Sequence, residues 1–272
     1  MRKIKYILDR KSLERIYFSY VRPILEYGHV IWSNCSLEFK TQLENTQLEA
    51  ARIVTGAVKR THHDKLYQET NWETLEKRRN DSTILLLHRI IKQDTPKYLH
   101  MLLPPPRAIN HITRQANNIP PIYARTDSYY NSFLPKAIRL WNALDKNIRN
   151  IQSTNILKSK LKNNNKTPKY YNSGSRKTQV YHSRIRMNCS DLNNDMFLRY
   201  LSDDSKCSCG YPTEDAKHYL LNCCIYQNVR QELFPDNITL EVLLYGDRNK
   251  NEQENKSIFL KVAEFIERSK RF

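Results

Sequence analysis

Apolar positions in the first third of the chain recur at the three- and four-residue spacing of helix faces. The first such stripe consists of Leu13, Ile16, Tyr17, Tyr20, Val21 and Ile24. Gly28 follows it as a stop signal, and further helices are predicted over about 37–55, ended by Gly56, and about 73–92. His88 lies within the apolar stripe of the third helix, and we interpret it as a packed side chain. Residues 1–103 are therefore predicted to form a helical bundle.

The remaining two thirds divide at changes in composition. Three consecutive prolines at 104–106 end the bundle, and residues 104–162 form a basic region that contains proline, tyrosine and short helices, one of them beginning near Pro135. Residues 163–183 are polar and are predicted to form a flexible linker. Residues 184–272 carry a Cys/His cluster and a last amphipathic helix, whose buried face should include Phe259, Val262 and Phe265. The predicted fold class is thus mostly α: a helical bundle, a basic linker region and a small helical C-terminal module that contains a zinc knuckle.

The positive charge is concentrated in the middle of the chain. The whole chain has a formal net charge of +17, and residues 104–187 carry 16 basic side chains but only two acidic ones, Asp127 and Asp145. A solvated surface normally mixes both signs, so this segment favours a polyanionic partner. The basic residues that we predict to contact nucleic acid are Arg107, Arg114, Arg125, Lys136, Arg139, Lys158, Lys160, Lys162, Arg176, Lys177, Arg184 and Arg186.

Several function classes have little support in the composition. The chain has only five glycines, which argues against glycine-rich phosphate loops. The longest apolar run, Ile84–Leu87, is far too short to span a membrane, so we expect no membrane partner. No spacing of serine, histidine and aspartate suggests a nucleophile, and no catalytic or cofactor-binding residue is predicted.

Four of the six cysteines lie within 18 residues, with a histidine between the two pairs. Three thiolates and one imidazole are an accepted ligand set for structural Zn²⁺, and Gly210 supplies a turn after the first pair. The predicted ligands are Cys207, Cys209, His218 and Cys223. Cys224 stays open as an alternative fourth ligand, while Cys35 and Cys189 are interpreted as lone thiols.

The order of several short motifs resembles one protein family. Cys207-Ser-Cys-Gly-Tyr-Pro, continuing through His218 to Cys223, resembles the C-terminal Cys-Cys-His-Cys knuckle of non-LTR (LINE/jockey-like) retrotransposon reverse transcriptases. Upstream blocks resemble the same family in the same order: Tyr20 to Gly28, Leu43 to Gly56, Asn71-Trp72 to Arg79, Ser132 to Leu144, and Arg184 to Phe197. The resemblance covers about residues 12–230 and corresponds to the thumb, linker and knuckle that follow the polymerase palm.

The resemblance implies a nucleic-acid-binding portion of an RNA-directed DNA polymerase, bound to RNA or to an RNA–DNA hybrid. Asp203-Asp204 is the only Asp-Asp pair, and it follows leucine and serine instead of the aromatic residue of a polymerase hairpin. We therefore expect the chain to have no enzymatic activity on its own. The alternatives are a polymerase or nuclease site completed by another chain, or a non-functional relic of a transposable element. The implied setting is an intracellular ribonucleoprotein, nuclear or cytoplasmic, with the polymerase part of the same element as a further partner.

Overall fold

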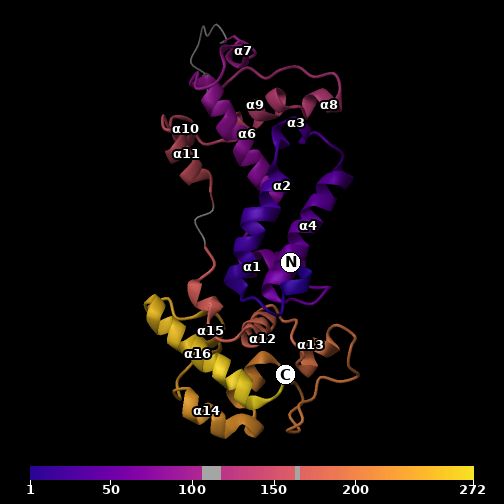
Figure 1. The fold of residues 1–272 in the computed structure, drawn as a ribbon, viewed down its shortest axis with the longest axis vertical. Coiled ribbons are helices and arrows are strands. Elements are labelled where there is room, and N and C mark those ends of the chain that lie inside the picture. Colours follow the sequence, from indigo (N-terminus) through magenta and orange to yellow (C-terminus); the bar gives the residue numbers. More distant parts are fainter. Residues whose placement is uncertain (106–117, 163–165) are drawn as a thin grey trace. The chain divides into compact units, whose positions relative to one another are not determined.

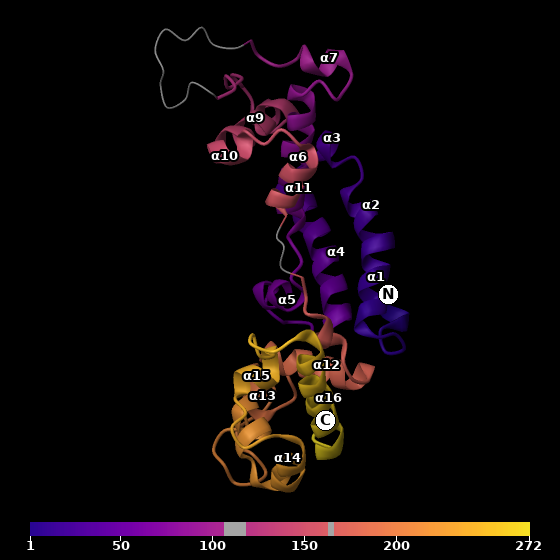
Figure 2. The same ribbon diagram turned by 90° about the vertical axis from the view of Figure 1, so that its left-hand side faces the viewer.

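The computed structural model describes residues 1–105, 118–162 and 166–272, which form helices and loops without a strand (Figures 1 and 2). The predicted mostly helical fold class is confirmed. The α-helices are α1 (Arg10–Ile16), α2 (Arg22–Glu26), α3 (His29–Trp32), α4 (Leu37–Thr55), α5 (His63–Thr70), α6 (Leu75–Ile91), α7 (Lys97–His100), α8 (Asp127–Tyr130), α9 (Phe133–Ala143), α10 (Lys146–Arg149), α11 (Thr154–Leu161), α12 (Arg176–Arg186), α13 (Asn193–Phe197), α14 (Gln227–Leu233), α15 (Leu240–Tyr245) and α16 (Glu252–Ser269). Short 3₁₀ and π-helical segments are η1 (Arg2–Ile4), η2 (Tyr17–Val21), η3 (Lys169–Asn172), η4 (His218–Asn222) and η5 (Cys224–Tyr226). Among the described residues, no helix is both long and apolar enough to cross a membrane.

The chain forms two compact units whose segments alternate along the sequence. Unit 1 consists of Met1–Arg22, Thr46–Trp72 and Lys166–Phe272, and unit 2 consists of Pro23–Asn45 and the described part of Glu73–Asn165. Helix α4 has residues in both units. This division differs from the sequential regions predicted above, because distant segments contribute to one core.

Unit 2 is built on α6, with α9 and α11 packed against it (Figure 2). Its core contains Ile84 and Leu87 of α6, Ile138 and Trp141 of α9, and Leu157 of α11. His88 is buried, and its two ring nitrogens lie 3.0 Å from Thr154 Oγ1 and 2.9 Å from the Ile151 carbonyl oxygen. The interpretation of His88 as a packed, hydrogen-bonded side chain is confirmed.

The largest core of unit 1 lies around α16, beside α12 and η3 (Figure 2). Phe259, Val262 and Phe265 of α16 are buried as predicted, and Tyr219 and Leu220 of η4 pack into the same core. Tyr219 also lies edge-on to Phe265, at 5.3 Å between ring centroids. The segment that bears the metal-ligand candidates is therefore anchored in the main core of the unit.

A buried ion network joins all three segments of unit 1. Glu69 of α5 accepts hydrogen bonds from Arg10 Nη1 at 2.5 Å and from Arg186 Nη2 at 2.6 Å, and each of the three side chains is no more than 3% exposed. Burial opposes ionisation of the Glu69 carboxyl, but the guanidinium groups of Arg186 and Arg10 outweigh it and lower its pKa to about 2. Removing one partner from such a network leaves an uncompensated buried charge.

The predicted flexible linker over 163–183 is corrected for residues 166–183, which lie in ordered structure. Tyr171 of η3 is buried against Phe259, and Thr178, Gln179 and His182 of α12 are buried as well. The polar composition of this stretch suggested a flexible linker. Its polar side chains instead form hydrogen bonds inside the unit, so they can be buried there. Gln179, for example, donates to the carbonyl of Asn172 and accepts from the Arg10 N–H.

The first predicted helix face is correct in part. Leu13 and Tyr17 are fully buried, whereas Tyr20 is 72% exposed and Ile24 is 76% exposed. The reason is the π-helical turn of η2, which begins at Tyr17 and adds a residue to the turn. The later side chains therefore rotate away from the face that the regular helical period predicted.

Candidate metal centre

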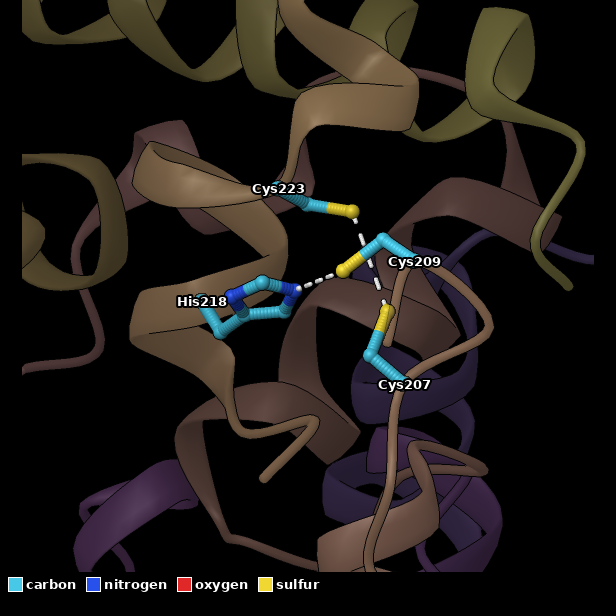
Figure 3. Close-up of side chains that lie close together, drawn as sticks. All are labelled: Cys207, Cys209, His218 and Cys223. Carbon is cyan, nitrogen blue, oxygen red and sulfur yellow. Dashed lines mark hydrogen bonds between the residues drawn. The ribbon is translucent and has the colours of Figure 1, made fainter. Parts of the chain in front are cut away.

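Cys207 and Cys209 lie on a tight loop that closes back on itself. The Gly210 N–H donates to the Cys207 carbonyl and the Cys207 N–H donates to the Tyr211 carbonyl, both at 2.9 Å. Gly210 adopts a positive φ of 89°, a conformation that glycine reaches without the strain of a Cβ atom. The turn directs both thiols to the same side of the loop (Figure 3).

His218 begins the π-helical turn η4, and Cys223 is the residue that follows it. The Cys223 N–H donates to the His218 carbonyl at 2.7 Å, which is the five-residue hydrogen bond of a π-helix and links the two ligands directly. Arg230 of α14 donates to the carbonyls of Leu220 at 3.0 Å and Cys223 at 2.7 Å, and thereby holds the extended residue Cys223 in place.

The four candidate ligand atoms converge on one point (Figure 3). All lie within 4.8 Å of one another, with 3.7 Å between Cys207 Sγ and Cys223 Sγ and 3.2 Å between Cys209 Sγ and His218 Nε2. Zn–S bonds of about 2.3 Å in a tetrahedron place two sulfurs about 3.8 Å apart. The cluster is thus close enough to hold a metal ion, and it is the only such His/Cys/Asp/Glu group in the part of the chain that the structure describes.

Cys223, and not Cys224, lies in the cluster. Cys223 is extended and fully buried in the cluster, whereas Cys224 begins η5, is exposed and does not belong to the cluster. Cys35 and Cys189 are free thiols outside it.

The thiols of the cluster respond to burial and to neighbouring backbone N–H groups. Burial raises the pKa of Cys207 to about 12 and also raises the pKa of Cys223, although the N–H groups of Cys209 and Ile225 act in the opposite direction. The Tyr211 N–H lowers the pKa of the Cys209 thiol. Each cysteine therefore receives an N–H from the residue two positions later, a pattern that favours thiolates once a cation is bound.

Side chains around the ligands fix their orientation. The Tyr211 ring stacks on the His218 ring at 4.4 Å, and Asp215 accepts the His218 backbone N–H at 2.7 Å. Glu214 lies 3.9 Å from Cys207 Sγ and is held by Arg271 through contacts of 2.8 and 2.6 Å. His218 Nε2 faces the sulfurs and lies 3.2 Å from Cys209 Sγ, so it is the ring nitrogen placed to bind a metal ion, whereas Nδ1 is buried without a described partner. Sequence reasoning missed Glu214 and Arg271, because only their pairing across 57 residues reveals them.

Comparison of the chain with protein-family models, with curated proteins and with solved structures finds no match. The family resemblance therefore stays an interpretation of the ordered sequence blocks.

The predicted nucleic-acid contacts fall in both units. In unit 2, Arg125, Lys158, Lys160 and Lys162 are exposed. Arg139 donates to the Tyr130 carbonyl and lies 3.5 Å from the centroid of that exposed ring. Lys136 is half-buried, and its pKa is lowered by that burial and by Lys40. Arg107 and Arg114 lie outside the described residues.

In unit 1, the four remaining candidates differ in accessibility. Lys177 is exposed, and Arg184 is half-buried with bonds to the Gly56 carbonyl and to Asp191. Arg176 donates to three backbone carbonyls, which fixes its guanidinium group within the fold. Arg186 is corrected: it is buried against Glu69, so it stabilises the protein interior and has no surface to offer a phosphate.

Proposed function

We propose that this chain is a nucleic-acid-binding module with a structural zinc centre, equivalent to the thumb, linker and knuckle of a non-LTR retrotransposon reverse transcriptase. The observation that carries the proposal is the convergence of three cysteines and one histidine in a chain whose middle segment is almost free of carboxylates. The ordered blocks named above support the family assignment.

Zinc is the metal that the donor set favours. Soft thiolates with one imidazole select Zn²⁺ over the hard cations, which prefer oxygen ligands. Four protein ligands would complete a tetrahedron and leave no position for substrate. The ion would therefore hold the 207–223 loop in shape and take no part in a reaction.

Exposed cations and exposed aromatic rings in unit 2 support a role in binding nucleic acid. Tyr123 is 85% exposed, and Tyr129 and Tyr130 are about half exposed, in the same basic region as Arg125 and Arg139. Aromatic faces stack on unpaired bases while lysine and arginine neutralise phosphates. The proposed ligand is RNA or an RNA–DNA hybrid, in a nuclear or cytoplasmic ribonucleoprotein.

The proposal assigns binding to this chain and leaves polymerisation to the palm of the parent family. Asp203 and Asp204 are exposed, and Asp204 accepts the Lys206 backbone N–H as an ordinary turn residue. A magnesium-dependent primer-extension assay tests the enzymatic alternative. Extension that is lost in Asp203→Ala would overturn the proposal.

The direct test is RNA binding by the purified full chain as a function of salt, followed by fluorescence anisotropy. Each neutralised phosphate of a single strand contributes about 0.7 to the slope of log K against log salt, so several contacts give a steep decline. Affinity that is unchanged between low and moderate salt would contradict the proposal.

A further inference from the structure

A cleft of about 390 Å³ opens in unit 1 between the N-terminal segment, the end of α4 and α12. It is lined by one carboxylate, Glu49, and by six cations from all three segments of the unit. The cations are Arg2, Lys5, Arg52, Lys59, Arg176 and Arg184. Four of these were not among the nucleic-acid contacts predicted from the sequence.

The packing of α12 on the end of α4 forms the wall of the cleft. Arg176, Val180 and Arg184 recur every four residues and share one face of α12. Gly56 lies directly beneath Val180, and a Cβ at this glycine would stand 2.5 Å from both Val180 methyl groups. The absence of a side chain at Gly56 therefore brings the two flanking arginines to the α4 terminus.

The cations of the cleft are only partly neutralised. Glu49 pairs with Arg2 at 3.1 Å and with Arg52 at 3.8 Å. Among the described residues, neither Lys5 nor Lys59 takes part in a salt bridge. The side chains thus leave a net positive charge that an anion can neutralise.

The pKa of Arg176 is consistent with the net positive charge of the cleft. Its guanidinium group donates to the carbonyls of Lys5, Ile53 and Val54, which fixes it in the wall of the cleft. Burial, followed by repulsion from Arg10 and Arg184, lowers the pKa of Arg176 to about 10. A bound anion would offset this repulsion.

An aromatic ring stands at the edge of the same cleft. Tyr6 is 77% exposed and lines the cleft, and Lys5 Nζ lies 4.6 Å from the centroid of its ring. Exposed rings beside unpaired cations are typical of grooves that hold single strands, in which bases stack and phosphates meet lysine and arginine.

We propose that this cleft binds an unpaired nucleic-acid strand, with Lys5, Arg52 and Lys59 facing its phosphates and Tyr6 stacking on a base. The inference rests on the proposed nucleic-acid function and adds a site in unit 1 to the basic region of unit 2. A double-stranded ligand fits less well, because its bases are already stacked and present no free face to Tyr6.

The test compares two double variants of the full chain that remove the same charge. Lys5→Gln/Lys59→Gln removes the unpaired cations of the cleft, and Lys256→Gln/Lys261→Gln removes two exposed lysines of α16 that do not line it. Binding of a 12-nucleotide oligo(U), the matching oligo(dT) and a duplex is measured over a salt series. The cleft variant should lower the slope of log K against log salt by about 1.4 for the single strands, and the affinity by about tenfold, whereas the α16 control should not.

A second pair of variants separates stacking from charge. Tyr6→Ala should weaken binding of the single strands at least about fivefold, and Tyr6→Phe should retain it, because the ring and not the hydroxyl makes the contact. The duplex should respond to neither change. Unaltered melting temperatures would show that all variants remain folded.

The outcomes distinguish this inference from the function on which it rests. If the wild type binds and the two double variants weaken binding equally, the cleft is not the binding site, while the proposed function stands. Absence of salt-dependent binding by the wild type would overturn both. Equal losses for single strands and duplex, with Tyr6→Ala without effect, would show that the cleft does not recognise an unpaired strand. A rise in melting temperature with inorganic phosphate, in a protein that binds none of the oligonucleotides, would also contradict the proposal.

Discussion

At the residue scale, Glu69 shows how a buried charge is stabilised by its surroundings. Its carboxylate meets Arg10 and Arg186 from two other segments, and each oxygen accepts at least one hydrogen bond. Such paired, charge-assisted hydrogen bonds offset part of the cost of removing the ions from water, while Arg186 Nη1 is buried without a described partner.

The lowered pKa of Glu69 predicts a specific loss of stability in acid. A carboxyl whose folded pKa is about 2, against an ordinary value of 4.5, stabilises the fold fully above about pH 4.5. That contribution, about 3 kcal/mol, should disappear as the pH falls from 4.5 towards 2. Urea unfolding should therefore show that the wild type is more stable than Glu69→Gln near pH 4.5 and above. This difference in the free energy of unfolding should become smaller as the pH falls from 4.5 towards 2. Parallel pH profiles for the two proteins would contradict the prediction.

The metal ligands give a second prediction at this scale. Cys209→Ser should abolish binding of one zinc ion per chain, measured by plasma mass spectrometry after dialysis, because the serine hydroxyl is a poor substitute for a thiolate. Structural zinc contributes on the order of 10 kcal/mol, so 1,10-phenanthroline should lower the melting temperature of the wild type but not of this variant.

Cys224→Ser is the matched control for the metal, because the exposed thiol lies one residue from the candidate ligand Cys223 yet outside the cluster. It should retain the zinc ion and the response to chelator. Loss of zinc in Cys224→Ser, with retention in Cys223→Ser, would show that the fourth ligand is wrongly assigned.

At the scale of elements, helix ends and close approaches depend on a few glycines. Gly56 ends α4 with a φ of +74° and lies against Val180, whereas Gly210 has a φ of +89° and nothing within 4 Å of an added Cβ. Both positions disfavour alanine through the backbone, but only Gly56 also has a steric conflict.

The two glycine-to-alanine variants should therefore differ in stability. Gly210→Ala should cost about 1 kcal/mol from its left-handed backbone. Gly56→Ala should cost about 1–3 kcal/mol more, because α12 must shift away from α4. Chemical denaturation of both proteins measures the difference, and equal losses would mean that the contact between Gly56 and Val180 relaxes freely.

The two helices for which the sequence predicted both ends, over about 37–55 and 73–92, agree with α4 and, within two residues, with α6. The predicted range of the second helix coincides with α4, because an apolar stripe and a following glycine mark it locally. The faces were less predictable: helical spacing places Phe39 on the same face of α4 as the buried Ala50 and Val54, yet Phe39 is 59% exposed. Which part of a face is covered depends on neighbours from elsewhere in the chain.

At the scale of the whole molecule, unit 1 requires three separate stretches of sequence. Arg186 of the last stretch needs Glu69 of the second, and Arg176 needs the carbonyls of Lys5, Ile53 and Val54. A fragment that begins at Lys166 retains the knuckle but leaves both guanidinium groups without these partners.

The fragment Lys166–Phe272 should thus be less stable than the full chain by at least about 3–5 kcal/mol, the cost of an unpaired buried charge. Thermal denaturation with zinc present should show a lower and broader transition, and adding a fragment of residues 1–165 should restore part of the difference. A cooperative transition at the full-chain temperature would show that the C-terminal core folds without the other segments.

The sequence by itself determined the helical class, the bounds of the helices over about 37–55 and 73–92, the position of the basic segment and the four metal-ligand candidates. These features depend on local periodicity, on glycine and proline, and on the spacing of residue types within a few turns. Only the tertiary structure decided the alternation of the two units, the ordered state of residues 166–183, the burial of Arg186 and the position of Cys223, and not Cys224, within the Cys/His cluster. Each of these depends on contacts between residues far apart in the chain, or on one irregular helical turn. The free energy of such contacts comes from burial and charge pairing, which no short window of sequence contains.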